Sequence, residues 1–215
     1  MISIAVTVRK IKNEKYHEIY NAISDDWLEF FYKLNINPIL FTDKDRKIEE
    51  KLKNNNCLGL ILTNGEDSQL KIGNQNNFLS GTKRDFIEYN LVKYCIKFNL
   101  PIAGFCRGHQ FLNRYFGGSL KKISNHAGTM HNVKIIEKKF IRIYKRNSIK
   151  VNSYHDNTII LDSLASILSP WAVSGNTVEG FYNIKYKIIS MMWHPERRKK
   201  INKYEIKLIK DHFYK

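Results

Sequence analysis

The chain has 215 residues, 43% of them hydrophobic and 13% aromatic, so it is apolar enough for a globular core and too apolar for a disordered segment. It carries 36 Lys and Arg against 20 Asp and Glu, a formal net charge of +16. The cations are scattered and no nucleic-acid motif accompanies them, so most of the charge is interpreted as solvated surface. At this length we expect one domain over residues 1–215.

Membrane and secretory segments are not expected from the hydropathy pattern. No apolar run reaches the roughly 18 to 20 residues that a transmembrane helix needs. The first apolar stretch, Ile2–Val8, precedes the basic residues, which is the reverse of a secretory signal. The cysteines form an odd set without metal-site spacing: Cys57, Cys95 and Cys106. We therefore expect a reduced, cytoplasmic protein.

In the first half of the chain, apolar segments rich in β-branched residues alternate with stretches of helical period. The predicted strands are Ile2–Val8, Pro38–Thr42, Cys57–Thr63 and Pro101–Phe105. The predicted helices are Tyr16–Leu34, Lys83–Phe98 and Gly108–Phe116. This alternation is typical of parallel strands joined by crossover helices.

After Gly118 the pattern changes to shorter, alternating pieces. The predicted strands there are Val133–Ile136, Phe140–Tyr144, Ser148–Val151, Trp171–Ser174, Val178–Tyr182 and Lys187–Trp193. A last amphipathic helix is predicted over Lys200–Phe213. The sequence thus predicts an α/β fold with an open, mainly parallel twisted sheet and helices on both faces, in which sites form outside the carboxyl ends of strands.

The most informative segment is the apolar strand Pro101–Phe105 and the pattern Gly-x-Cys-x-Gly that overlaps its end, with Cys106 between Gly104 and Gly108. This pattern is typical of a nucleophile elbow, a strained strand-to-helix turn that exposes its central residue and needs small neighbours. Amides at the start of the following helix would favour the thiolate, which is the attacking form of cysteine. By itself the pattern also fits a buried structural cysteine beside two turn glycines.

A second candidate segment lies near the C-terminus, where the apolar run Ile188–Trp193 is followed by His194, Pro195 and Glu196. Pro195 biases His194 toward an extended backbone, and residues two apart in an extended chain face the same side. A thiol nucleophile needs an imidazole nearby, and the imidazole needs a partner that fixes its tautomer and stabilises its cation. We therefore predict a triad of Cys106 as nucleophile, His194 as base and Glu196 as orienting carboxylate.

Four blocks, in order along most of the chain, resemble motifs of the class I glutamine amidotransferase superfamily. They are Thr63–Asp67, Gly104–Gln110 with Gly117 and Gly118 after it, Val151–His155, and Trp193–Glu196. The pair Arg84 and Asp85 resembles one typical of the γ-glutamyl hydrolase branch, although it also fits an ordinary charged helical turn. Within this branch the chain is most similar to the γ-glutamyl-CDP-amidate hydrolases of capsular phosphoramidate synthesis. The resemblance implies a flavodoxin-like domain of the glutamine amidotransferase type.

The resemblance also implies site residues. The N–H groups of Gly65 and Arg107 would form the oxyanion hole, although the family usually has two or more glycines where this chain has Asn64-Gly65. The positions that would contact substrate, some through their backbone, are Arg107, Gln110, Tyr154, Asp156 and Asn157. A helix-facing glutamine and an ordinary loop would carry the same residues, and the Arg107 side chain could equally form a salt bridge.

By this resemblance the reaction is hydrolysis of a γ-glutamyl amide through a Cys106 glutamyl thioester, with no metal or organic cofactor. His126 and His131 could suggest a metal pair, but no Cys or carboxylate completes a ligand set. The expected partner is a small phosphorylated substrate, γ-glutamyl-CDP-amidate, giving cytidine diphosphoramidate for capsule modification. No nucleic acid or membrane partner is expected. The alternatives are another small γ-glutamyl amide such as γ-glutamyl-γ-aminobutyrate, a glutaminase subunit of a two-chain amidotransferase, and a basic binding protein with an inactive site.

Overall fold

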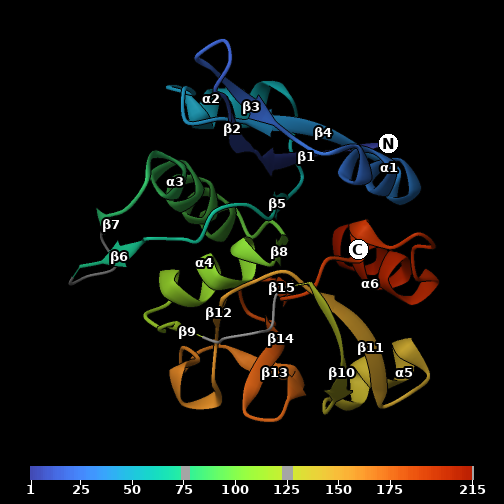
Figure 1. Ribbon diagram of the computed structural model, residues 1–215. Coiled ribbons are helices and arrows are strands. Elements are labelled where there is room, and N and C mark those ends of the chain that lie inside the picture. Colours follow the sequence, from blue (N-terminus) through green and yellow to red (C-terminus); the bar gives the residue numbers. More distant parts are fainter. Residues whose placement is uncertain (74–77, 123–127, 215) are drawn as a thin grey trace.

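The computed structural model describes residues 1–73, 78–122 and 128–214. Within these ranges a nine-stranded sheet runs through the protein in the order β11-β10-β13-β14-β15-β8-β5-β1-β4 (Figure 1). The strands from β15 to β4 are all parallel, and β14, β13, β10 and β11 extend the sheet by antiparallel pairing. Its strands are β1 Ile2–Thr7, β4 Ile36–Phe41, β5 Leu60–Leu62, β8 Ile102–Phe105, β10 Thr129–Ile135, β11 Ser148–Ser153, β13 Ser169–Ser174, β14 Thr177–Asn183 and β15 Ile188–Met191.

Helices cover both faces of this sheet. The α-helices of the described ranges are α1 Asp25–Leu34, α2 Ile48–Asn54, α3 Lys83–Lys97, α4 Arg107–Tyr115, α5 Lys138–Tyr144 and α6 Lys203–Phe213. Side chains of α1, α5 and α6 join one buried apolar cluster, and those of α2, α3 and α4 join the other. Strand residues divide with period two between the faces, as Ile4 and Val6 belong to the first cluster and Ala5 to the second. The predicted open α/β sheet with helices on both faces is confirmed.

Shorter elements decorate the sheet. They are the two-stranded pairs β2 Arg9–Asn13 with β3 Glu18–Ala22, β6 Lys71–Ile72 with β7 Phe78–Ser80, and β9 Lys121–Lys122 with β12 Asn157–Thr158, and the 3₁₀ turns η2 Leu161–Ser163 and η3 Pro195–Arg197. Among the described residues, none of the helices has the length and apolar character needed to cross a bilayer.

The helix predicted over Tyr16–Leu34 is wrong in its first part, because residues 9–22 form the β2–β3 hairpin and α1 begins only at Asp25. Ile19 matches the helical spacing of Ile23, but its side chain is exposed in the hairpin, whereas Ile23 packs against the core. Antiparallel pairing supplies the backbone hydrogen bonds of this segment, so it needs no continuous buried face.

The strand predicted over Phe140–Tyr144 is also wrong, since this segment is helix α5. Phe140 and Tyr144 are both buried and lie four residues apart, on one face of the helix, where both rings stack on Trp171. The remaining predicted strands and helices coincide with elements of the structure, with ends that differ by a few residues. Helix α2 was not predicted.

The parallel part of the sheet brings three predicted motifs to one edge. Strands β5, β8 and β15 are neighbours, and Met191 of β15 lies in register with Phe105 of β8. The residues that follow these strands, Thr63 after β5, Cys106 after β8 and His194 after β15, therefore emerge side by side at the carboxyl edge.

Candidate active site

Cys106 occupies a sharp turn between β8 and α4. Its backbone has φ 50° and ψ −100°, a positive-φ conformation outside the allowed left-handed helical region and strained for a residue with a side chain. The turn is held from both sides, because the Cys106 N–H donates to the carbonyl of Met191 at 3.0 Å and the Gln110 N–H donates to the carbonyl of Cys106 at 3.0 Å. The predicted strained elbow is therefore present in the structure.

The glycines on either side of Cys106 leave the space that this turn needs. A Cβ at Gly104 would lie 2.7 Å from Leu112 Cδ1 and 2.8 Å from the carbonyl oxygen of Gly108. A Cβ at Gly108 would collide with the backbone of Leu62 on β5. Helix α4 can therefore pack directly onto strands β8 and β5 only if both positions lack a side chain.

His194 and Glu196 meet beyond the end of β15. The Nδ1–H of His194 donates to Glu196 Oε1 at 2.7 Å, and both side chains are buried. Pro195 begins the 3₁₀ turn η3, which turns Glu196 back toward the imidazole. The Nε2 atom of His194 is buried and has no hydrogen-bond partner among the described residues, so the second ring nitrogen is left for Cys106.

The surroundings of His194 favour its protonated form. Burial disfavours the imidazolium, but the neighbouring Cys106 side chain and the Glu196 carboxylate outweigh burial and raise the pKa of His194 to about 9. The imidazole therefore holds a proton next to the thiol at neutral pH, which is the state that a thiolate nucleophile requires.

Two asparagines that the sequence analysis did not single out lie against this histidine. Asn152 Nδ2 donates to the carbonyl of His194 at 2.9 Å, and the His194 N–H donates to Asn152 Oδ1 at 2.9 Å. Asn64 Nδ2 lies 3.4 Å from His194 Nδ1, while Asn64 Oδ1 accepts from Trp27 Nε1 at 3.0 Å. Asn64 lies in the block Thr63–Asp67 and Asn152 in the block Val151–His155, two of the four that resemble superfamily motifs. Membership in these blocks was the sequence signal that could have identified both residues.

Gly65 lies in the loop after β5, beside Cys106. Its φ of +146° and the position of Arg84 Nη1, with which a Cβ would collide, require glycine here. Arg84 fixes the loop, because its Nη2 donates to the carbonyl of Thr63 and its Nη1 to the carbonyl of Asn64, both at 3.0 Å. The loop that carries Gly65 is thereby tied to helix α3.

The Arg107 side chain does not reach the site, which corrects the predicted substrate contact. Its guanidinium is completely buried, with Nη2 2.7 Å from Asp85 Oδ1 and Nη1 paired with Glu88. Arg84 shares Glu88 through Nε at 2.8 Å, so two arginines and two carboxylates form one buried network. Only the backbone N–H of Arg107, the first residue of α4, remains at the elbow.

A cavity of about 320 Å³ opens above Cys106. Of the predicted site residues, Gly65, Cys106, Tyr154 and His194 line it; the wall is completed by Arg9, Lys10, Ile11, Asn64, Glu66 and Arg197. The hairpin β2–β3 thus contributes to the site, which the sequence analysis did not predict.

Three further predicted substrate contacts do not line this cavity. Gln110 is buried, with Nε2 donating to the carbonyl of Asn157 at 3.1 Å and Oε1 without a partner among the described residues. The Asn157 side chain donates to Asp67, and Asp156 is exposed. Gln110 and Asn157 are therefore hydrogen-bonded to each other, and neither lines the cavity.

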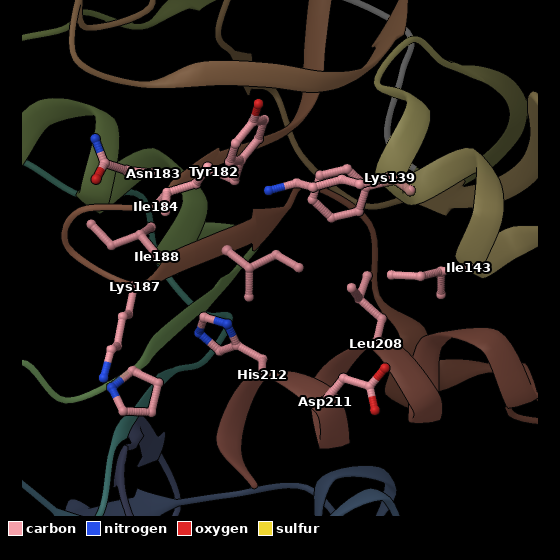
Figure 2. Close-up of a pocket in the computed structure, with 13 residues that line it drawn as sticks. Lys139, Ile143, Tyr182, Asn183, Ile184, Lys187, Ile188, Leu208, Asp211 and His212 are labelled. Carbon is pink, nitrogen blue, oxygen red and sulfur yellow. The ribbon is translucent and has the colours of Figure 1, made fainter. Parts of the chain in front are cut away.

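A second cavity, of about 460 Å³, opens at the opposite edge of the sheet, between α5, α6 and the turn that joins β14 to β15 (Figure 2). Residues at the starts of β8 and β15 line it, together with Lys139, Tyr182 and His212. Burial lowers the pKa of His212 to about 4 despite its hydrogen bond to the carbonyl of Ile102. None of the predicted site residues lines this cavity, so we place the chemistry in the smaller one.

The suggested histidine pair lies only partly within the residues that the structure describes. His131 lies 3.4 Å from Glu179, and His126 lies outside the described residues. Across residues 1–73, 78–122 and 128–214, no three His, Cys, Asp or Glu side chains are placed to hold a metal ion.

Comparison with known proteins gives consistent matches. The Peptidase C26 family profile matches residues 1–196. The γ-glutamyl-CDP-amidate hydrolase of Campylobacter jejuni is 28% identical over 214 residues, which cover 98% of this chain and 96% of that protein.

Solved structures share the fold. The glutaminase domain of Trypanosoma brucei CTPS with bound acivicin has a TM-score of 0.73 at 15% identity, over 100% of this chain and 95% of that one. A glutamine amidotransferase from Thermotoga maritima has a TM-score of 0.62 at 18% identity, over 99% of this chain and 84% of that one. The predicted fold of the class I glutamine amidotransferase type is confirmed by these likenesses.

Proposed function

The chain belongs to the Peptidase C26 family, and from this premise we propose that it hydrolyses a γ-glutamyl amide bond through a glutamyl thioester on Cys106. The observation that carries the proposal is the strained elbow at Cys106, in a cavity that it shares with a buried His194 whose other nitrogen is bound to Glu196. A thiol, an imidazole and a carboxylate in this order are the parts that thiol-dependent acyl transfer needs.

In the first step, the Cys106 thiolate attacks the γ-carbonyl carbon, and the carbonyl oxygen becomes an oxyanion. The N–H groups of Gly65 and Arg107 would donate to that oxygen. The protonated His194 then gives its Nε2 proton to the leaving nitrogen as the C–N bond breaks. Glu196 holds the opposite Nδ1 proton, so Nε2 is the nitrogen that exchanges a proton with the reacting groups.

In the second step, neutral His194 takes a proton from water, and the resulting hydroxide attacks the thioester carbonyl. The thiolate leaves, glutamate is released, and the imidazolium is restored. Every proton transfer in this scheme passes through one nitrogen of His194.

For the glutamyl group we propose a pocket that includes Gln110 and the 154–157 segment. The buried Gln110 Oε1 has no partner among the described residues and could accept a hydrogen bond from the substrate ammonium. Tyr154 lines the cavity itself, while Asp156 and Asn157 would act through their backbone. A small opening movement of this wall would be needed to admit the ammonium.

The substrate we propose is γ-glutamyl-CDP-amidate, which would be cleaved at its carbonyl C–N bond to glutamate and cytidine diphosphoramidate, for capsule modification. The relative from Campylobacter jejuni that bears this activity in its name matches nearly the whole chain. The cavity beside Cys106 also carries Arg9 and Arg197, which suit a phosphorylated leaving group.

The test is glutamate release by the parent protein and by Cys106→Ala, with Cys57→Ala as a matched control because Cys57 is buried away from the cavity. γ-Glutamyl-CDP-amidate, γ-glutamyl-γ-aminobutyrate and glutamine are offered in parallel. We expect release from the first substrate that requires Cys106 and not Cys57. Glutamate release by Cys106→Ala equal to that of the parent would refute the mechanism. Faster release from γ-glutamyl-γ-aminobutyrate than from γ-glutamyl-CDP-amidate would make the former the substrate. Glutamine hydrolysis that requires an added synthase would identify the chain as a glutaminase subunit.

A further inference from the structure

The hairpin β2–β3 brings positive charge to the cavity above Cys106. It follows directly on β1, whose carboxyl end lies at the same edge of the sheet as the site (Figure 1). Its first three residues, Arg9, Lys10 and Ile11, line the cavity together with Gly65 and Cys106. This hairpin forms a wall of the site that lies outside the β5, β8 and β15 motifs.

Apart from the catalytic Cys106 and His194, the charged groups facing the cavity are Arg9, Lys10, Glu66 and Arg197. Lys10 is neutralised, because its Nζ lies 2.6 Å from Asp43 Oδ2. Glu66 is the one carboxylate among them, and its Oε2 lies 3.5 Å from Nη1 of Arg84, a guanidinium that is also bound to Glu88. These pairs leave the two guanidinium groups as the charges available to a ligand.

Arg9 and Arg197 differ in how firmly they are held. Arg9 is half-buried, and its guanidinium makes no hydrogen bond or ion pair with the residues that the structure describes. Arg197 packs its guanidinium over the Tyr154 ring at 4.7 Å and lies 3.7 Å from Glu196 Oε1, an oxygen already bound to His194. Both therefore keep free N–H donors at the cavity wall.

The reaction geometry determines which part of a substrate meets these donors. The γ-carbonyl must lie against Cys106 and the loop at Gly65, so the leaving group extends over the rest of the cavity wall. That wall is the hairpin on one side and Arg197 with Tyr154 on the other. A planar guanidinium binds phosphate or carboxylate oxygens through two parallel hydrogen bonds, which a solvated surface lysine does not.

We propose that Arg9 and Arg197 form an anion-binding pair that holds the leaving group of the substrate and selects γ-glutamyl amides of phosphorylated or carboxylated amines over neutral ones. The inference rests on the proposed hydrolase function and adds the residues that determine its substrate class. The hairpin is, on this account, the specificity element of the enzyme.

The experiment compares Arg9→Gln, Arg197→Gln and the control Lys12→Gln. Lys12 lies on the same strand as Arg9, but it is largely exposed, is paired with Glu14 and does not line the cavity. The substrates are γ-glutamyl-CDP-amidate, γ-glutamyl-γ-aminobutyrate and the neutral γ-glutamylmethylamide, all with the same glutamyl group. Pyrophosphate is added as a competitive inhibitor of γ-glutamylmethylamide hydrolysis.

Each arginine variant should lower kcat/KM for the anionic substrates by about tenfold to a hundredfold, the loss expected for a hydrogen bond to a charged group. The kcat/KM for the neutral substrate should fall much less, so the ratio of kcat/KM for an anionic substrate to kcat/KM for the neutral one should fall. The inhibition constant of pyrophosphate should rise. Lys12→Gln should match the parent. A response confined to γ-glutamyl-CDP-amidate and pyrophosphate identifies phosphate as the recognised anion, and a response shared with γ-glutamyl-γ-aminobutyrate extends recognition to carboxylate.

The proposal is overturned if either arginine variant leaves the ratio of anionic to neutral kcat/KM unchanged. This includes an equal fall in kcat/KM for all three substrates, which is the result expected for a residue that holds the glutamyl group. Failure of the underlying function has a different result. In that case the parent protein itself releases no more glutamate than Cys106→Ala from any of the three substrates. The proposed role of Arg9 and Arg197 is then refuted together with the hydrolase function.

Discussion

Replacing Arg84 by Met should disconnect the loop that carries Gly65 from helix α3. The Arg84 guanidinium donates to the carbonyls of Thr63 and Asn64 and to Glu88, and it is buried. Methionine fills much of the same volume but offers no donor, so the two carbonyls lose this donor and Glu88 keeps only Arg107 and Thr7 as partners. The buried network of two arginines and two carboxylates would then hold one uncompensated negative charge.

The magnitude follows from these contacts. Three lost hydrogen bonds at about 1 kcal/mol each, one of them to a carboxylate, give about 3 to 4 kcal/mol. Removing one partner of a buried ion pair gives about 3 to 5 kcal/mol, so the two estimates agree. If the loop moves, the Gly65 N–H leaves the oxyanion, which would lower kcat by roughly a hundredfold or more.

The assays are urea unfolding and glutamate release. Lys83→Met is the matched control, because Lys83 is the exposed neighbour of Arg84 on helix α3 and forms no hydrogen bond with the carbonyls of Thr63 and Asn64. Arg84→Lys, which keeps the charge but not the forked donors, should lie between Arg84→Met and the parent. The reasoning is refuted if Arg84→Met unfolds within about 0.5 kcal/mol of the parent, the range of ordinary surface substitutions, and keeps its kcat.

Three further predictions follow from single positions. Glu196→Gln should move the alkaline limit of kcat/KM to lower pH, because the carboxylate helps to raise the pKa of His194 to about 9 against burial and an amide does so less. Gly65→Ala should lower kcat by roughly a hundredfold, since a Cβ would meet Arg84 at a φ that suits glycine. Glu205→Gln should raise the free energy of unfolding at pH 7, because burial raises the pKa of this carboxyl and penalises its ionised form.

Each of these has a discriminating measurement. The pH–rate profile of Glu196→Gln would contradict the assignment if its alkaline limit were unchanged or higher. Gly117→Ala is the control for Gly65→Ala, because Gly117 also has a positive φ but no atom lies near the position of an added Cβ. Equal losses of activity in the two variants would contradict the role given to the loop at Gly65. For Glu205 the folded pKa lies above the unfolded value of 4.5, so the gain should shrink as pH falls toward 4.5; a gain that grew on acidification would reverse the sign.

Much of the fold and the placement of the triad side chains could be predicted because they depend on local patterns. The run Ile188–Trp193 and the strand before Cys106 are apolar and bounded by turn residues, so their carboxyl ends locate His194 and Cys106. The predicted contact of His194 with Glu196 is present, although the 3₁₀ turn η3, and not the expected extended chain, brings the two side chains together.

The parts that could not be predicted depend on partners far away in the chain. The Arg107 side chain turns from the site because Asp85 and Glu88, on another helix, bind it. Asn152 reaches His194 across 42 positions, which no local pattern encodes. The β2–β3 hairpin was missed because Ile19 continues the helical spacing by coincidence, although its side chain is exposed.

The central claim is a glutamyl thioester on Cys106 that all substrates share. The most direct measurement adds hydroxylamine to the reaction and determines the ratio of γ-glutamyl hydroxamate to glutamate for γ-glutamyl-CDP-amidate, γ-glutamyl-γ-aminobutyrate and γ-glutamylmethylamide. The account predicts one ratio for all three, because the same acyl-enzyme is divided between water and hydroxylamine after the leaving group has gone, and no hydroxamate with Cys106→Ala. A ratio that changes with the leaving group, or hydroxamate formed without Cys106, would contradict it.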